Sequence, residues 1–219
     1  MSVIAVANLK GGVGKSTVAQ NLAVCLSAKG RTTVLVDTDS VQESTIEWGG
    51  IREKKGLPPL AVRALPEDRL MSEILDLADQ FEFVVIDGTP VLGEITTKAM
   101  SVADLVLIPV MPSGNDFRAL RKFLLRCEDV RKVKLKQGFP FTIAVVMNEY
   151  SDKLIIDKAI LEAVQKMEVR MLKTSLANRA AYREATLTGT GVVEMRDAKA
   201  AREIEALTDE ALALLTANG

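Results

Sequence analysis

The stretch KGGVGKST, residues 10–17, constrains this chain most, because it follows a short β-branched run and precedes a stretch of helical period. A glycine-rich turn that opens a helix points backbone N–H groups and the positive end of the helix dipole at one place, which favours a phosphate group. The turn is made by Gly11, Gly12, Val13 and Gly14. The stretch therefore predicts a nucleotide-phosphate site in an α/β fold.

Two polar residues at the end of the stretch supply further chemistry. Lys15 is expected to neutralise the β and γ phosphates, and Ser16 to place its hydroxyl on Mg²⁺. Where the pattern G-x-x-x-x-G-K-[ST] has its first glycine, this chain has Leu9, and a second lysine, Lys10, follows directly. A glycine-rich turn that binds nothing is the alternative, and the position between a strand and a helix argues against it.

Short apolar runs alternate with longer stretches of helical period, which is typical of a parallel sheet with helices on both faces. We expect strands at 3–7, 33–37, 60–65, 83–87, 104–110 and 141–148, with a weaker seventh at 168–174. Helices are expected at 16–29, 44–55, 66–79, 94–102, 116–132, 151–166 and 197–216. Because no linker long enough to divide domains occurs, residues 1–219 are predicted to form one doubly wound, mostly parallel α/β domain.

Composition excludes several classes of function. Lys and Arg number 28 against 29 Asp and Glu, so any contact with nucleic acid needs a local patch. The chain has no histidine, which removes the commonest general base and zinc ligand. Cys25 and Cys127 lie far apart without C-x-x-C spacing, and no leader precedes Val3, so a cytoplasmic protein is expected. No apolar run approaches the length of a membrane span.

Carboxylates end two of the expected strands. Asp37 and Asp39 close the second strand, and one is expected to hold metal-bound water while the other holds a nucleophilic water. The alternative is an Asp that caps the following helix or turn. Asp87 closes the apolar fourth strand, which is typical of a carboxylate that orients Mg²⁺ through water.

The stretches KGGVGKST, DTD and VVIDG, in this order and spacing, resemble the deviant Walker A ATPases of the ParA/MinD group. The stretches LVLIPVMPSGNDF, AVVMNEY and RAAYREA extend the resemblance over nearly the whole chain, and small ParA-type partition ATPases of the ParF kind are the most similar. The resemblance implies that Mg-ATP closes a sandwich dimer, in which Lys10 contacts the phosphates of the opposite subunit and Lys15 those of its own. A second fixed cation would stabilise charge that develops on the transferred phosphoryl group.

The same resemblance implies roles for five further residues. Asp39 orients the attacking water, and Asp37 and Asp87 lie around Mg²⁺. Thr17 contacts a phosphate, and Asn148 reads the adenine. Lys10, Lys15 and Asp39 are thus the expected catalytic residues.

The sequence departs from the family at two places. Ala177 stands in the expected base-covering segment 177–179, where many relatives have proline. The stretch DTDSVQ replaces D-x-D-P-Q, so the loop after Asp39 is expected to be one residue longer and to lack its rigid proline. Trp48 follows this loop and is expected to pack in a helix.

A basic stretch and the C-terminus bear on partners. The stretch could contact DNA phosphates, and its cations are Arg118, Arg121, Lys122, Arg126, Arg131, Lys132, Lys134 and Lys136. An ordinary solvated helix face, partly at a dimer interface, is the alternative, and Arg179 and Arg183 are further candidates for a DNA surface of the dimer. The C-terminal stretch is amphipathic but acidic, so a docked helix is expected rather than a membrane anchor.

The sequence thus predicts a cytoplasmic, nucleoid-associated partition ATPase. It would form a homodimer with ATP, bind nonspecific DNA or assemble further, and respond to a centromere-binding partner that stimulates hydrolysis. One alternative is an ATPase of the same fold that positions other cargo, such as a transfer complex or a polar synthase. Another is a metabolic enzyme that phosphorylates a small carboxylate.

Overall fold

The computed structural model describes residues 1–39, 42–91 and 93–217. Within these ranges, seven parallel strands form one sheet in the order β3-β2-β4-β1-β5-β6-β7. The strands are β1 (Ser2–Val6), β2 (Thr33–Asp37), β3 (Ala61–Ala64), β4 (Phe83–Asp87), β5 (Leu105–Val110), β6 (Thr142–Met147) and β7 (Arg170–Ser175). The helices are α1 (Lys15–Ala28), α2 (Ser44–Lys54), α3 (Leu70–Leu77), α4 (Glu94–Val102), α5 (Gly114–Lys136), α6 (Ile155–Gln165), α7 (Ala180–Thr188), the 3₁₀ turn η1 (Val192–Glu194) and α8 (Ala198–Thr216).

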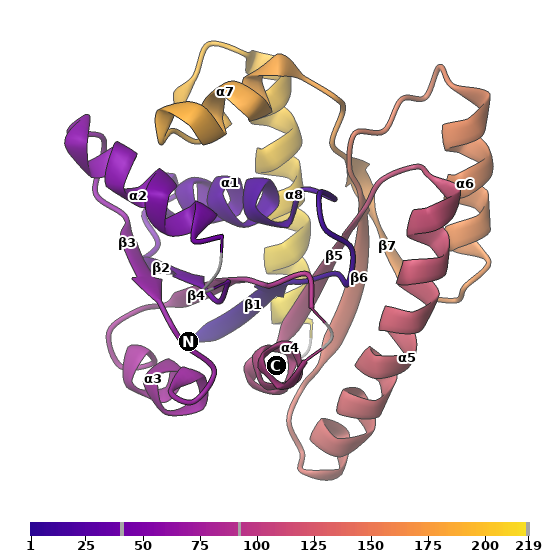
Figure 1. Ribbon diagram of the computed structural model, residues 1–219, viewed down its shortest axis with the longest axis horizontal. Helices are drawn as coiled ribbons and strands as arrows, with labels where there is room; N and C mark the ends of the chain where they lie inside the picture. Colours follow the sequence, from indigo (N-terminus) through magenta and orange to yellow (C-terminus); the bar gives the residue numbers. More distant parts are fainter. Residues whose placement is uncertain (40–41, 92, 218–219) are drawn as a thin grey trace.

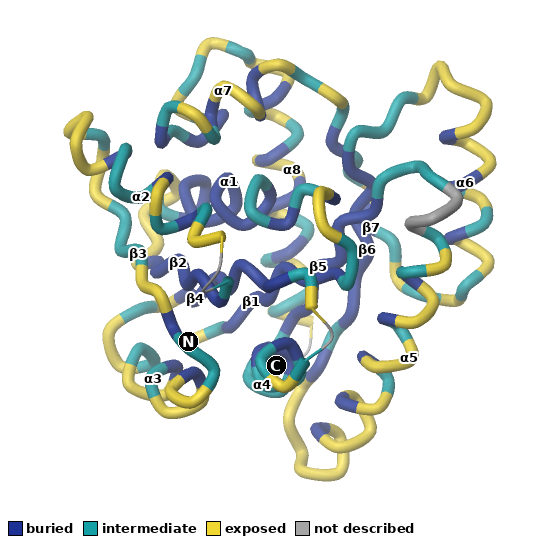
Figure 2. Tube along the Cα trace, viewed as in Figure 1, coloured by how far each residue is buried: buried dark blue, intermediate teal, exposed yellow. Residues whose placement is uncertain are grey.

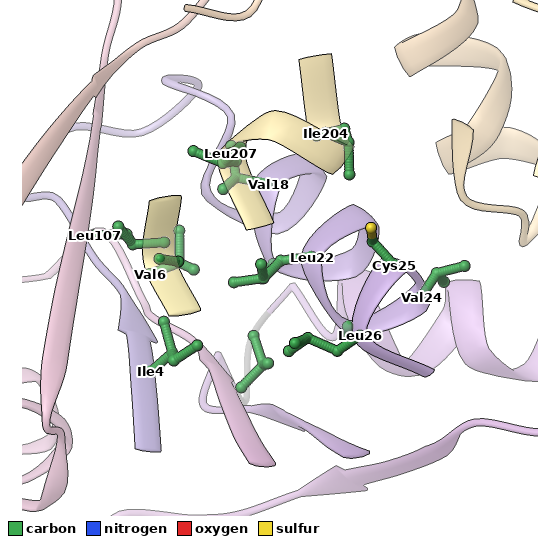
Figure 3. Packing of buried hydrophobic residues seen from close by; sticks show 14 of the residues in the cluster. Ile4, Val6, Val18, Leu22, Val24, Cys25, Leu26, Leu107, Ile204 and Leu207 are labelled. Atoms are coloured by element: carbon green, nitrogen blue, oxygen red, sulfur yellow. The ribbon is translucent and has the colours of Figure 1, made fainter. Parts of the chain in front are cut away.

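Helices cover both faces of the sheet, which explains why the central strands are apolar along their whole length. The helices α1, α2, α7 and α8 pack on one face, and α3, α4, α5 and α6 on the other (Figure 1). Figure 3 shows α1 packed on the sheet beside α8, with Val18 and Leu22 among Val6, Leu107 and Leu207, and α8 also contacts β5 and β7 directly. The architecture is the α/β doubly wound fold that the sequence predicts.

The register of the central strands brings the predicted carboxylates together. Asp37 lies opposite Asp87 in the pairing of β2 with β4, and Asp87 lies opposite Val6 in the pairing of β4 with β1. The glycine-rich loop follows β1 directly. Parallel strands end at the same edge, so this edge collects the loop and both carboxylates.

Most predicted elements are confirmed within a few residues, including the weak seventh strand. The helices expected at 66–79 and 151–166 begin only at Leu70 and Ile155, and the basic helix α5 is longer than expected. Helix α7 and the turn η1 are two elements that the sequence pattern does not predict. Figure 2 shows that much of α5 away from its buried stripe is exposed. No helix in the described part of the chain is long and apolar enough to cross a bilayer.

Candidate functional site

The glycine-rich loop joins β1 to α1 in a conformation that needs its glycines. Gly12 and Gly14 have φ of 75° and 89°, in the left-handed region. A Cβ atom on Gly14 would lie 2.2 Å from Nδ2 of Asn148, so no larger residue fits there without displacing that side chain. The backbone is thus free to turn its N–H groups inward, as the sequence predicts.

Two buried asparagines hold this loop to the neighbouring strands. Asn8 donates from Nδ2 to the carbonyl of Pro109, at 2.8 Å, in β5. Asn148, which follows β6, donates from Nδ2 to the carbonyl of Val13, at 2.9 Å. Asn148 therefore fixes the crest of the loop, while its predicted part in reading the adenine stays a prediction.

Helix α1 begins with Lys15, whose ammonium lies inside the loop. Its Nζ donates to the carbonyl of Lys10 at 3.0 Å, and the residue is only 7% exposed. Burial lowers the pKa of Lys15, and the negative charges of Asp87 and Asp39 counteract that shift. The structure thus holds a desolvated cation where the sequence predicts the phosphates.

Lys10 lies differently from Lys15. Its backbone N–H donates to Oδ1 of Asn8 at 3.2 Å, and its Nζ donates to Oγ of Ser113 at 3.4 Å. Ser113 belongs to the turn between β5 and α5. The side chain of Lys10 therefore lies along the neighbouring turn, away from the ammonium of Lys15.

Asp37 is buried and caps the start of α2. Its Oδ2 accepts hydrogen bonds from the backbone N–H groups of Thr45 (3.0 Å) and Ile46 (3.2 Å). Its Oδ1 accepts the N–H of Asp39 at 2.9 Å. Burial raises its pKa, while these three bonds act in the opposite direction. These contacts are those of an Asp that caps the following helix, which is the alternative that the sequence offers. A role of Asp37 around Mg²⁺ stays a prediction.

The carboxylate of Asp87 lies in surroundings that fit a bound cation. Its Oδ2 accepts the hydroxyl of Thr45 at 2.7 Å, but its buried Oδ1 has no hydrogen-bond partner among the described residues. Burial raises the pKa of Asp87 to about 7, although the hydroxyl bond from Thr45 and the charge of Lys15 act in the opposite direction. A buried carboxylate oxygen without a partner is costly, so a metal-bound water in front of it would remove that cost. Asp87 and the hydroxyl of Ser16 thus fit a magnesium ion with its water shell.

A cavity of about 580 Å³ lies in front of these groups, a volume within the usual range of small-molecule sites. Its lining includes Gly11, Gly12, Gly14, Lys15, Ser16, Thr17, Asp39, Ser44, Asp87, Asn148, Glu149, Asn178, Arg179, Tyr182, Arg183 and Leu187. Most predicted site residues therefore meet in one cavity. Lys10, Val13 and Asp37 are outside the lining, as are Arg118, Arg121 and Lys122, which are exposed on α5.

The far side of the cavity is formed by α7 and the segment before it, which the sequence reasoning missed in part. Glu203 of α8 accepts hydrogen bonds from the backbone of Ala177 (3.2 Å), from Nε of Arg179 (2.9 Å) and from the hydroxyl of Tyr182 (2.9 Å). One carboxylate thus holds the predicted base-covering segment. Arg179 is paired here, and its predicted contact with DNA stays a prediction.

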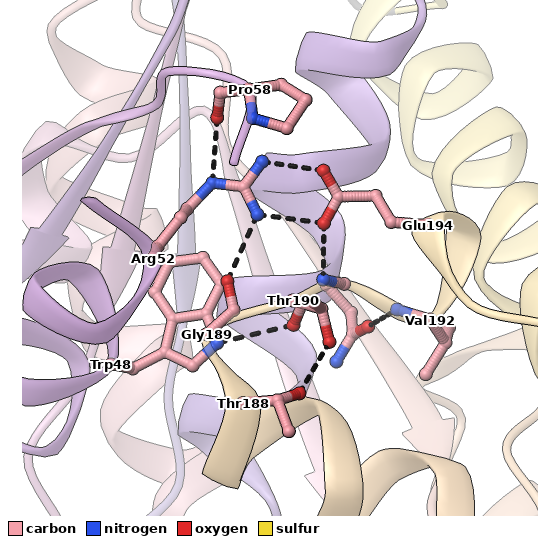
Figure 4. Close-up of polar contacts among 10 residues, drawn as sticks. Trp48, Arg52, Pro58, Thr188, Gly189, Thr190, Val192 and Glu194 are labelled. Carbon is pink, nitrogen blue, oxygen red and sulfur yellow. Dashed lines mark hydrogen bonds and ion pairs between the residues drawn. The ribbon is translucent and has the colours of Figure 1, made fainter. Parts of the chain in front are cut away.

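A buried ion pair connects α2 to the chain after α7 (Figure 4). The guanidinium of Arg52 binds both carboxylate oxygens of Glu194, at 2.8 and 2.6 Å, and donates to the carbonyls of Pro58 and Gly189. Trp48 is 1% exposed, so its predicted packing role is confirmed, and its indole N–H donates to the carbonyl of Thr190. The helix that follows the Asp37–Asp39 segment is therefore tied to the helix that lines the cavity.

Lys134, counted in the basic stretch, is buried, donates to the carbonyl of Ala103 and lies over the ring of Phe141, so it is not available to DNA. The predicted lengthening of the loop after Asp39 falls on Ser40 and Val41, which lie outside the described residues.

Replacing Asn148 with alanine is expected to weaken ATP and GTP to the same extent, about tenfold, because the loss of the bond to Val13 loosens the phosphate loop. Titration calorimetry with both nucleotides measures this. A loss confined to ATP would show that Asn148 acts on the base and that its hold on the loop is unimportant for binding.

The fold and the loop together define a class of protein. A glycine-rich turn with a buried lysine, placed between the central strand of a parallel sheet and the helix that follows, is the site of a P-loop nucleotide-binding protein. The sequence pattern of the CobQ/CobB/MinD/ParA nucleotide binding domain matches residues 4–192. The chain therefore belongs to this family, and it is a P-loop ATPase of the ParA type.

Individual relatives agree with this assignment. The maintenance of carboxysome distribution protein A of Halothiobacillus neapolitanus is 32% identical over 215 residues, 95% of each chain. A probable plasmid-partitioning protein ParA of Thermus thermophilus is 26% identical over 244 residues, 92% of this chain and 75% of the relative.

Solved structures share the fold. Apo McdA from Cyanothece has a TM-score of 0.81 at 19% identity, covering 97% of this chain and 99% of that one. The septum site-determining protein MinD of Pyrococcus horikoshii, in complex with Mg-ADP, has a TM-score of 0.74 at 21% identity, covering 100% and 98%. At such identities these likenesses concern the fold alone.

Proposed function

We propose that this chain is an ATP-driven positioning protein, in which Mg-ATP closes a homodimer that binds DNA without sequence preference and hydrolysis releases it. The observation that carries the proposal is the pair of lysines, since Lys15 lies buried in the phosphate loop while Lys10 lies outside its own cavity. A loop lysine with no place in its own cavity is well suited to reach the nucleotide of a second subunit.

Each group of residues in the cavity has its own proposed role. Backbone N–H groups of the loop and the ammonium of Lys15 bind the phosphates, and Thr17 adds a further contact there. Ser16 and Asp87 would hold Mg²⁺ with its water. The ion, when bound, neutralises phosphate charge. Asp39 lines the cavity and would hold the attacking water, whereas Asp37 lies outside the lining and caps α2.

Support for bound ATP and Mg²⁺ comes from related folds. The MinD of Pyrococcus horikoshii binds Mg-ADP, and a McdA variant of Cyanothece binds ATP. The orphaned oxygen of Asp87 in this chain agrees with a magnesium ion nearby.

Two kinds of cargo fit such a protein. The first is plasmid or chromosome DNA, moved with a centromere-binding partner that stimulates hydrolysis, and the resemblance to ParA supports it. The second is a protein body that is spaced over the nucleoid. The relative named for carboxysome distribution supports this second candidate, because it is similar over 95% of both chains.

The proposal is tested by fluorescence anisotropy of a random-sequence DNA duplex, titrated with the protein in ATP and in ADP at two salt concentrations. We expect binding with ATP only, weaker at the higher salt, because phosphate contacts release counterions. Arg118, Arg121, Lys122 and Arg183 are the exposed cations to replace first. Equal binding in both nucleotides, or none in either, would contradict a nucleotide-gated DNA surface.

A further inference from the structure

A second large hollow lies at the other edge of the sheet, between α5 and α6. It encloses about 1020 Å³ and runs past the amino ends of β6 and β7, whereas the nucleotide cavity lies at their carboxyl ends. Its lining includes Phe117, Arg121, Leu124, Leu125, Glu128, Arg131, Leu135, Phe141, Ile143, Lys166, Met167, Glu168, Val169 and Arg170. The stretch of α5 along it, from Phe117 to Leu135, is about 27 Å long, so the hollow is a groove suited to a peptide segment more than to a small molecule.

The floor and the rim of the groove are apolar. Phe141 and Ile143 are buried beneath it, at 6% and 9% exposure. Leu125 and Leu135 stand on its α5 side with 66% and 56% of their surface exposed. Leucines so exposed beside an apolar floor indicate a surface that is covered in some state of the protein.

The charges around the groove are mainly positive. Arg121, Arg131, Lys166 and Arg170 belong to its lining, against Glu128 and Glu168. Glu128 and Arg131 are paired at 3.1 Å and compensate each other, which leaves Arg121, Lys166 and Arg170 against Glu168. An occupant with apolar side chains and flanking carboxylates would match this lining.

Helix α3 of the same chain has that chemistry. Leu70 and Ile74 face the core, but Met71 and Leu75, one turn apart, are 44% and 68% exposed. The segment 67–79 carries five acidic residues and one basic residue, and Asp68, Asp76 and Asp79 are exposed. Its outer face is therefore apolar in the middle and acidic around it.

A chain cannot use its own α3 for its own groove. Helix α3 follows β3 at one edge of the sheet, and the groove lies over β6 and β7 at the other edge, with α4 between them (Figure 1). We propose that the outer face of α3 of a second copy of this chain docks into the groove between α5 and α6. DNA fits the groove less well, because the exposed leucines of the rim would face its phosphates.

The contact differs in kind from the proposed ATP-dependent dimer. It is heterologous, since two different surfaces meet, and it leaves both nucleotide cavities open. A helix of two turns buries far less than a standard interface, so the association is weak, with a dissociation constant on the order of 100 µM.

Sedimentation velocity of the protein without nucleotide, from about 5 to 500 µM, tests the proposal in the range that weak interfaces require. We expect concentration-dependent association. Leu75→Ser on α3 and Leu125→Ser on the groove should each weaken it by at least about tenfold, because each removes an apolar contact. Ile156→Ser, at an apolar residue of comparable exposure (60%) outside the groove lining, is the matched control and should leave association unchanged.

Mixing the two defective variants gives the decisive result. The Leu75→Ser chain keeps an intact groove and the Leu125→Ser chain keeps an intact α3, so their equimolar mixture should associate clearly more strongly than either variant alone. A wild-type protein that stays monomeric throughout, a control as defective as the variants, or a mixture that stays dissociated would each overturn the proposal.

Discussion

A Lys15→Ala variant is expected to lose nucleotide affinity by on the order of 100-fold, because it removes the one cation that the loop holds inside itself by a hydrogen bond to Lys10. Calorimetry with ATP and with ADP measures the loss. The fold should survive, since burial lowers the pKa of this ammonium and thus disfavours the charge in the protein without nucleotide.

The matched control is Lys29→Ala at the other end of α1. Lys29 is paired with Asp209 on the surface and lies far from the loop, so its loss should leave nucleotide affinity unchanged. ATP affinity of the Lys15→Ala variant within a few fold of the wild type, in a folded protein, would contradict the assignment of the phosphate site.

A Glu194→Ala variant is expected to unfold about 6 to 12 °C below the wild type at pH 7, which corresponds to about 3 kcal/mol for a chain of this size. The reason is Arg52, which is 4% exposed and would lose the carboxylate that compensates its buried charge, while it keeps the carbonyls of Pro58 and Gly189 and the ring of Trp48. Differential scanning calorimetry measures the change. Asp209→Ala, which breaks the exposed pair with Lys29, is the control and should barely move the midpoint.

The effect of Glu194→Ala should depend on pH. Burial opposes ionisation of Glu194, but hydrogen bonds from Arg52 and from the backbone of Gly191 outweigh it and lower the pKa below its usual 4.5. A carboxylate with a lowered pKa stabilises the folded state above its unfolded pKa and loses that contribution as the pH falls through its folded pKa. The difference in unfolding temperature between the Glu194→Ala variant and the wild type should therefore shrink below about pH 4.5. A difference that stays constant with pH would contradict an ionic origin.

The sequence predicts what depends on local pattern. The strands are continuous β-branched runs, and the loop from Lys10 to Thr17 has its chemistry in consecutive residues. Because parallel strands end at a common edge, the order of the elements is enough to bring Asp87 and the loop together.

What the sequence does not reveal depends on residues far apart. Helix α7 is short and mixes polar with apolar residues, so its period is weak, and its place is set by Glu203 of a later helix. Arg52 and Glu194 are separated by 142 positions, and nothing local marks either as a partner. Thr45 carries no local signal either, although its hydroxyl donates to Asp87, because a threonine in the first turn of a helix is ordinary in sequence.

The central claim, that Lys10 serves the nucleotide of the opposite subunit, is tested most directly by mixing two inactive variants. Lys10→Ala should bind ADP yet lose ATP turnover, and Asp39→Ala should bind ATP, hydrolyse it poorly and trap dimers. In a mixed dimer, the Lys10→Ala subunit keeps its own Asp39 and receives Lys10 from its neighbour, so one of the two sites is complete. We predict that an equimolar mixture regains turnover, up to about a quarter of the wild-type rate for random pairing. A mixture as inactive as its components would contradict the account, because both lysines would then act within one chain.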